Sequence, residues 1–128
     1  MKKIIQTPLA PAPIGPYNQA VLINNMLYTS GQIPLNMETG FVEMNDIKLA
    51  TKQVMDYLKQ ILQAAEMNFE NVIKVSIFIK DMNDFQHINE VYASYFDEAT
   101  APARETVEVA RLPKDAPIEI SLVACKDA

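Results

Sequence analysis

The sequence predicts an α+β domain in which one mixed β-sheet carries two helices on one of its faces. Two observations lead to this fold class. Apolar residues recur at helical spacing in two separate segments, and β-favouring runs lie before, between and after those segments. No linker, charge block or repeat interrupts the 128 residues, a length close to that of one domain. We therefore expect residues 1–128 to form a single domain with the order hairpin, helix, strand, helix, strand, strand.

The first expected element is a β-hairpin. Ala20 to Ile23 and Met26 to Ser30 are short apolar runs. Asn24 and Asn25 join them, and asparagine tolerates the left-handed backbone that a two-residue turn requires. Ahead of the hairpin, the proline-rich stretch from Pro8 to Pro16 is expected to lie extended over the fold, because proline biases the preceding residue away from helix.

Helical spacing predicts two amphipathic helices. The first runs from Ile47 to Ala65, where apolar residues recur three or four apart with charged residues between them. The second runs from Phe85 to Phe96, and Asp84 or Asn83 is expected to cap its first turn. Pro102 ends this helical segment.

Alternation of apolar and polar residues predicts three further strands, at Val72 to Lys80, Arg104 to Ala110 and Ile118 to Ala124. The closing strands offer two candidate apolar outer surfaces, formed either by Val107 and Val109 or by Ile118, Ile120 and Leu122. An apolar sheet face is usually hidden by association. We therefore expect a homo-oligomer with its sites between subunits.

Charge and hydropathy exclude several classes of function. The formal charge is −5 and lysines and arginines form no cluster, so nucleic acid is not expected as a ligand. No apolar run approaches the ~20 residues that cross a bilayer, and the amino-terminal segment lacks a signal-peptide core. We expect a cytoplasmic protein with no membrane partner.

Familiar catalytic groups are scarce. The single histidine, His87, has no serine, cysteine or acidic partner placed by motif, and a solvent-facing helix position is favoured over a catalytic base. Only three glycines occur, so neither a phosphate loop nor a dinucleotide fingerprint can be written.

What remains is a set of polar residues next to turns and strand ends. Tyr17 follows the turn-forming Gly15 and Pro16, Gly31 ends the hairpin, and Arg104 begins a strand. Each alone has a structural interpretation: a packing aromatic, a turn glycine, half of a surface ion pair. Strand alternation places Arg104 and Thr106 on one face of the sheet, with Glu105 and Val107 on the other.

Taken together, these segments resemble a known family. Residues 15–20 (GPYNQA), 28–34 (YTSGQIP), 102–113 (PARETVEVARLP) and 118–120 (IEI) are similar to the RidA (YjgF-type) reactive intermediate deaminases, over nearly the whole chain. The resemblance implies a chorismate-mutase-like α+β domain that assembles as a homotrimer with clefts at the subunit boundaries. It also implies the hydrolysis of 2-iminopropanoate and 2-iminobutanoate to 2-keto acids and ammonia, with no cofactor or metal.

The same resemblance implies roles for individual residues. Arg104 would bind the substrate carboxylate, because a planar guanidinium offers two parallel donors that match it. Glu119 and the backbone carbonyl of Thr106 would hold and polarise the attacking water or the imine nitrogen. Residues implied in catalysis are Arg104, Glu119 and Tyr17, and those implied in substrate binding are Ser30, Gly31, Asn89 and Thr106.

Three positions depart from the family pattern. Thr106 stands where many members have a cysteine, so thiol chemistry is not expected here. Glu105 replaces a small residue and could compete for the guanidinium of Arg104 if the strand were distorted. Asn18 stands where serine is common.

Other functions stay open at this point. The cleft could capture a 2-keto acid or another metabolite without turnover, as a regulatory trimer. An RNA-cleaving or protein-protective role has less support, because the charge is unfavourable for RNA and no histidine pair is present. Exposed Met26, Met37 or Met44 could contact client proteins, although filling gaps in the core is the commoner use of methionine. Glu119 could also be a strand-end carboxylate that pairs with Arg111 or a lysine.

Overall fold

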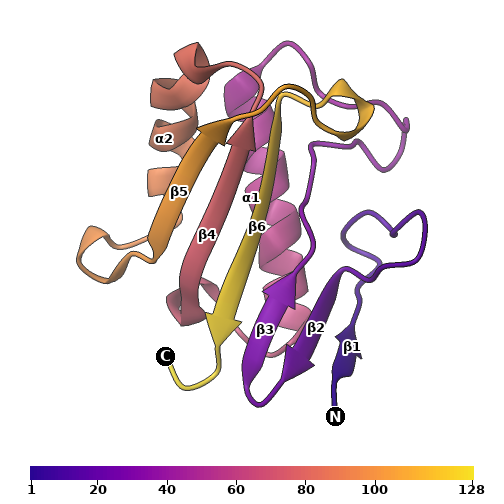
Figure 1. Ribbon diagram of the computed structural model, residues 1–128, viewed down its shortest axis with the longest axis vertical. Coiled ribbons are helices and arrows are strands. Elements are labelled where there is room, and N and C mark those ends of the chain that lie inside the picture. The colour runs from indigo at the N-terminus through magenta and orange to yellow at the C-terminus, as the bar shows by residue number, and fades with distance from the viewer.

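Six strands form one mixed sheet, and two helices cover one of its faces (Figure 1). The computed structural model describes residues 1–128. The strands are β1 (Lys3–Ile5), β2 (Ala20–Ile23), β3 (Met26–Thr29), β4 (Val72–Ile79), β5 (Ala103–Glu108) and β6 (Ile118–Cys125), and the helices are α1 (Ile47–Ala64) and α2 (Phe85–Ala93). The sheet order is β1-β2-β3-β6-β4-β5, with β4 and β5 parallel and the other pairs antiparallel. The predicted fold class, a mixed sheet with two helices on one face, is confirmed.

The predicted hairpin is confirmed, and a short strand beside it was not predicted. Asn24 and Asn25 have φ values of 48° and 64°, the left-handed conformation expected at the β2–β3 turn. β1 pairs with β2 from Lys3↔Leu22 to Ile5↔Ala20. Because β1 has only three residues, its sequence carries too little alternation to be distinguished from a loop.

Helix α1 supplies the larger part of the core. Asp46 caps its first turn, because its carboxylate accepts a hydrogen bond from the backbone N–H of Leu49 at 3.0 Å. The buried stripe of the helix follows the predicted spacing, and its members include Val54, Met55, Leu58, Ile61 and Leu62, all at 0% exposure. This stripe packs on the sheet and joins α1 to the same hydrophobic cluster as β4 and β6.

The second helix differs from the prediction at both ends. A short 3₁₀ turn at Met82–Asp84 precedes it, and Asp81 caps that turn, whereas Asp84 makes no capping bond. The predicted cap at Asp84 or Asn83 is therefore wrong. The α-helix also ends at Ala93 rather than Phe96. The apolar pattern of the sequence extends beyond Ala93 because the chain remains in a tight turn there. This turn places the Phe96 ring against that of Phe69, with the ring centroids 5.3 Å apart.

The two faces of the sheet have different surroundings. Ile118, Ile120 and Leu122 point toward the helices and are 0 to 3% exposed, so they are not an outer surface. Val107 lies on the opposite face and is 40% exposed, as the alternative interpretation expected. On this open face, which no helix of the chain covers, register and alternation place Ile4, Val21, Tyr28, Lys74, Ser76, Phe78, Glu105, Val107, Glu119, Ser121 and Val123.

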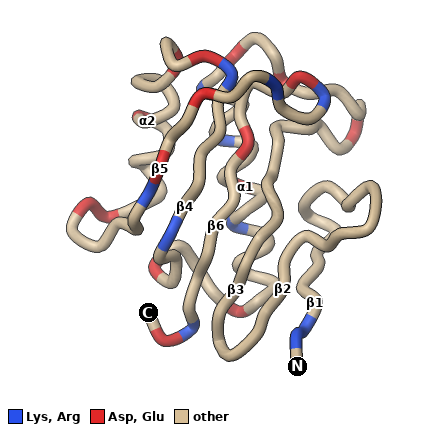
Figure 2. Tube along the Cα trace, in the orientation of Figure 1, with Lys and Arg blue, Asp and Glu red and all other residues tan.

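Neither helix combines the length and the apolar character needed to cross a bilayer. Lysines and arginines are scattered among acidic residues along the trace (Figure 2). His87 is exposed on α2, as the sequence analysis favoured.

Candidate functional site

Arg104 lies on β5, the strand at one edge of the sheet, with its side chain on the helix side. Its neighbour across the ladder is the core residue Val75, which is 1% exposed and points the same way. The Arg104 guanidinium reaches α2, where Nη1 donates a hydrogen bond to Oδ1 of Asn89 at 2.7 Å. Cζ lies 4.9 Å from the ring centroid of Tyr92 and 5.6 Å from that of Phe85. The guanidinium is therefore partly buried between the sheet edge and the helix.

No carboxylate neutralises this guanidinium. The four ion pairs of the structure join Lys48 to Glu90, Lys52 to Asp56, Lys74 to Glu105 and Arg111 to Asp115. The interpretation of Arg104 as half of a surface ion pair is therefore wrong. Its Nε and Nη2 groups also have no protein acceptor. A partly buried cation with two free donors on one edge can hold a carboxylate through paired hydrogen bonds.

Thr106 lies two residues further along β5, on the same face as Arg104. The N–H of Val109 donates to the carbonyl of Ile79 at 2.9 Å, so the backbone groups of the odd-numbered residues point toward β4. Because these groups alternate along a strand, the N–H and C=O of Arg104 and Thr106 point to the free edge of the sheet. They are the backbone groups placed to meet a ligand held by Arg104. The Thr106 hydroxyl oxygen, by contrast, is buried without a hydrogen-bond partner.

Glu105 does not compete for Arg104. It lies on the open face, where its carboxylate pairs with Lys74 at 2.8 Å and accepts a hydrogen bond from the Ser76 hydroxyl. The hydrogen bond from Lys74, followed by that from Ser76, lowers the pKa of the Glu105 carboxyl. Because side chains alternate regularly along β5, the strand is not distorted in the way that would let Glu105 compete for the Arg104 guanidinium.

Glu119 and Gly31 form a second group of predicted site residues. Mutual hydrogen bonds between Gln32 and Ile120, at 2.8 and 3.1 Å, bring the segment after β3 alongside β6. A Cβ at Gly31 would lie only 2.6 Å from Cδ of Glu119, so glycine is what lets the Glu119 side chain pack on this backbone. The Glu119 carboxylate has no ion-pair or hydrogen-bond partner, and Arg111 binds Asp115 instead. Burial raises the pKa of the Glu119 carboxyl.

Ser30 and Tyr17 belong to the chain around this second group. The Ser30 hydroxyl donates to the carbonyl of Asn18 at 2.6 Å, and its N–H donates to the carbonyl of Gln19 at 2.9 Å. Tyr17 follows a turn in which its N–H donates to the carbonyl of Gly15 at 2.9 Å, and its side chain is 50% exposed. Ser30 is therefore tied directly to the loop that presents Tyr17.

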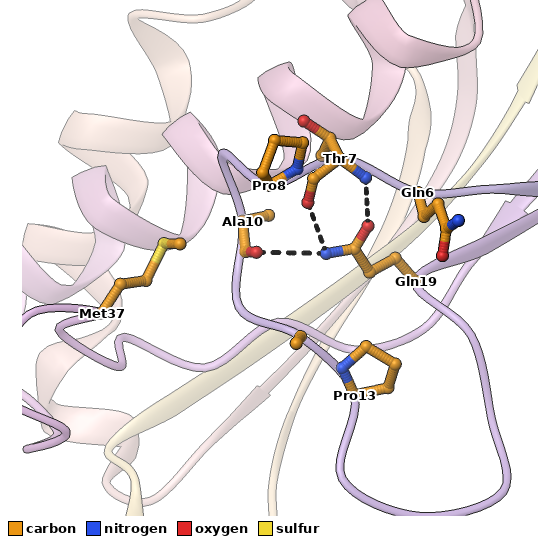
Figure 3. A pocket seen from close by; sticks show the side chains of 8 residues that line it. Gln6, Thr7, Pro8, Ala10, Pro13, Gln19 and Met37 are labelled. Atoms are coloured by element: carbon orange, nitrogen blue, oxygen red, sulfur yellow. Dashed lines mark hydrogen bonds between the residues drawn. The ribbon is translucent and has the colours of Figure 1, made fainter.

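The buried amide of Gln19 holds that loop together (Figure 3). Its Nε2 donates to the carbonyls of Thr7, Ala10 and Pro11 at 3.1, 3.1 and 2.9 Å, and its Oε1 accepts from the N–H of Thr7 at 2.7 Å. The proline-rich stretch has no strand partner, so this one side chain, 3% exposed, supplies the hydrogen bonds that a ladder would give. A cavity of about 360 Å³ lies beside this amide and is lined by residues of the same stretch and by Met37. This role of Gln19 was not predicted from the sequence.

The seven predicted site residues thus form two groups rather than one. Arg104, Asn89 and Thr106 lie on the helix side of β5. Glu119 lies on the open face of β6, beside Gly31, and β4 separates the two strands. Within one chain the sheet stands between the guanidinium and the carboxylate. Phe85 and Tyr92, which contact Arg104, were predicted only as part of the second amphipathic helix, because helical spacing does not show which strand a helix will cover.

Comparisons with known proteins agree with this architecture. A family model described as endoribonuclease L-PSP matches residues 7–126. A RutC family protein of Pyrococcus horikoshii is 52% identical over 99% of this chain and 100% of its own length. The 2-iminobutanoate/2-iminopropanoate deaminase of Escherichia coli is 48% identical over 98% of this chain and 99% of its own length.

Solved structures are similar along the whole chain. A crystal structure of a putative endoribonuclease from Thermotoga maritima superposes with a TM-score of 0.94 at 44% identity and covers 100% of both chains. The structure of E. coli TdcF with bound serine has a TM-score of 0.89 at 44% identity and covers 97% of this chain and 98% of its own.

Proposed function

Because the chain belongs to the RidA (YjgF-type) family, whose family model is described as endoribonuclease L-PSP, we propose that it hydrolyses 2-iminopropanoate and 2-iminobutanoate to 2-keto acids and ammonia. The unpaired guanidinium of Arg104 carries this proposal. A cation kept next to α2 without a counterion fits a small organic acid. The bound serine of TdcF, itself an amino acid with a carboxylate, supports the same class of ligand.

In this proposal Arg104 fixes the substrate by its carboxylate and leaves the C=N carbon open to water. Water adds to that carbon while one of its protons passes to the nitrogen, which gives a carbinolamine. The remaining proton of that water then passes from the hydroxyl to the nitrogen as the C–N bond breaks, which releases ammonia and leaves a ketone. The backbone carbonyl of Thr106, which points to the free edge of β5, can accept a hydrogen bond from the attacking water. Glu119 can take a proton from that water and return it to the leaving nitrogen. Burial raises the pKa of the Glu119 carboxyl toward neutral pH, and a carboxyl whose pKa is nearer the working pH exchanges protons more efficiently.

A second copy of the chain is part of the proposal. Glu119 and Arg104 lie on opposite faces of one sheet, so a complete site needs Glu119, Gly31 and Tyr17 from a neighbouring copy. The open face, with Val107 and Tyr28 exposed, offers a surface for that contact. We propose a homotrimer with three such clefts. Sedimentation equilibrium is expected to give three times the mass of the 14.4 kDa chain.

The reaction can be tested directly. A threonine dehydratase in excess generates the imine faster than it hydrolyses spontaneously, so the appearance of 2-ketobutyrate and ammonia reports hydrolysis. The proposal predicts a faster appearance with the protein present. A rate equal to the uncatalysed one refutes the enzyme. Tight binding of 2-ketobutyrate without acceleration would instead support the regulatory trimer that binds 2-keto acids.

A further inference from the structure

Three residues of α2 contact the same guanidinium. Phe85, Asn89 and Tyr92 are spaced i, i+4 and i+7, so they form one stripe along the helix. The stripe lies over Arg104: Oδ1 of Asn89 accepts from Nη1 at 2.7 Å, and the rings of Tyr92 and Phe85 lie 4.9 and 5.6 Å from Cζ. We call these three residues the α2 cradle.

The contacts leave one edge of the guanidinium free. Asn89 engages Nη1, whereas Nε and Nη2 have no protein acceptor. Those two groups lie side by side and match the two oxygens of a carboxylate. The aromatic rings attract the cation without using any of its N–H groups. The cradle therefore restrains the guanidinium without occupying its binding edge.

We propose that the α2 cradle positions Arg104, holding its guanidinium in one orientation with the Nε–Nη2 edge presented before any ligand arrives. Asn89 is then a positioning residue that acts through Arg104, which differs from the substrate contact implied by the family resemblance. The consequence for substrate binding rests on the proposed function. The restraint on Arg104 does not, because it is a property of the unliganded protein.

Tyr92 contributes to the cradle through its ring. The residue is 6% exposed, and its hydroxyl is buried without a hydrogen-bond partner. Burial raises the pKa of Tyr92 to about 12, so the phenol stays neutral and its electron-rich face remains available to the cation. Phenylalanine at this position should therefore preserve the cradle, and leucine should not.

Nuclear magnetic resonance can test the restraint because Arg104 and Arg111 are the only arginines of the chain. In protein labelled with ¹⁵N-arginine, ring currents from Phe85 and Tyr92 should displace the Arg104 side-chain signals from those of Arg111. Rotation about the Cζ–Nη1 bond should also be slower for Arg104. Arg111, which is exposed and paired with Asp115, is the internal control. Indistinguishable, rapidly averaged signals from the two arginines would overturn the proposal.

Variants separate positioning from a general loss of structure. Tyr92→Leu should shift the Arg104 signals toward those of Arg111, and Tyr92→Phe should not. If Tyr92→Leu does not fold, Asn89→Ala, at a partly buried position, should still accelerate the Nη1 rotation. Gln86→Ala, exposed on the same helix, is the matched control and should change nothing. Unchanged Arg104 signals in folded Asn89→Ala would contradict the cradle.

A double-mutant cycle then connects the cradle to binding. Asn89→Ala is expected to weaken calorimetric binding of 2-ketobutyrate about tenfold in the presence of Arg104 and to have no further effect in Arg104→Ala. An equal loss in both backgrounds would show that Asn89 contacts the ligand itself, and so contradict positioning. If wild type neither binds 2-ketobutyrate nor accelerates imine hydrolysis, the proposed function fails, while the arginine signals still test the cradle independently.

Discussion

The carboxylate of Glu119 packs against the backbone of Gly31 so closely that a Cβ at position 31 would lie 2.6 Å from its Cδ. Gly31→Ala should therefore displace Glu119. The alanine itself is tolerated, because the atoms it meets belong to a side chain and the φ of Gly31 is not positive. We expect kcat for imine hydrolysis to fall about tenfold or more, with a free energy of unfolding within about 1 kcal/mol of wild type.

Gly40→Ala is the matched control, and it should lower stability without lowering activity. Gly40 has φ +79° and no atom within 4 Å of an added Cβ, so alanine there meets backbone strain but no contact. It should cost about 1 kcal/mol of stability and leave kcat unchanged. Full activity in Gly31→Ala would show that the Glu119 position is irrelevant to catalysis.

Glu119→Gln should stabilise the protein at neutral pH. Burial raises the folded-state pKa of this carboxyl above its ordinary 4.5, so the folded state binds the proton more tightly than the unfolded state does. The free energy of unfolding then falls as pH rises from about the unfolded-state pKa through the folded-state pKa. Glutamine does not ionise, so the substitution removes that loss. Because the side chain is only partly buried, the gain at pH 7 should stay below about 1 kcal/mol.

Urea denaturation at pH 4 and pH 7, at one protein concentration, measures this difference. The gain from Glu119→Gln should be present at pH 7 and smaller at pH 4, while imine hydrolysis is lost. A variant less stable than wild type at pH 7 would mean that the charged carboxylate is favourably held in the folded protein.

Thr106→Val should leave activity within about twofold of wild type. The Thr106 hydroxyl oxygen is buried without a partner, and the proposed contribution of this residue is its backbone carbonyl. Valine keeps the shape and the strand preference, and removing an unpaired buried hydroxyl should raise stability by up to about 1 kcal/mol. A tenfold loss in kcat/KM in a stable variant would assign the hydroxyl a direct part in the reaction.

Gln19→Leu should destabilise the fold by about 2 kcal/mol or more, because it leaves three carbonyls and the N–H of Thr7 without their partner. Gln63→Leu, on the exposed side of α1, provides the control and should lie within about 0.5 kcal/mol of wild type. Urea denaturation distinguishes them. Equal midpoints would mean that the proline-rich stretch does not depend on this amide.

Local pattern was enough to predict most of the elements. The seven buried residues of α1 recur at helical spacing, and β4 alternates between faces from Lys74 to Ile79, so both were predicted to within one or two residues. β1 is too short to show a pattern. The end of α2 was missed because a turn after Ala93 keeps Tyr95 and Phe96 partly buried against the core, as a continued helix would.

The site was harder to predict because its contacts join distant segments. Residues 31 and 119 meet through the bridge between Gln32 and Ile120, and nothing local indicates that pairing. Likewise the apolar spacing predicted an amphipathic helix at α2, but the position of Phe85 and Tyr92 over Arg104 depends on β5 lying parallel to β4 at the sheet edge. Family resemblance named Arg104, Glu119 and Gly31 but did not reveal these contacts.

The central claim is that Arg104 binds the substrate carboxylate, and the rate of 2-iminobutanoate hydrolysis by Arg104→Ala tests it most directly. Loss of a charge-assisted double hydrogen bond should lower kcat/KM about 100-fold or more. Arg111→Ala, which removes the other arginine and its exposed pair with Asp115, should remain within about twofold of wild type. An Arg104→Ala variant that hydrolyses the imine as fast as wild type would contradict the account.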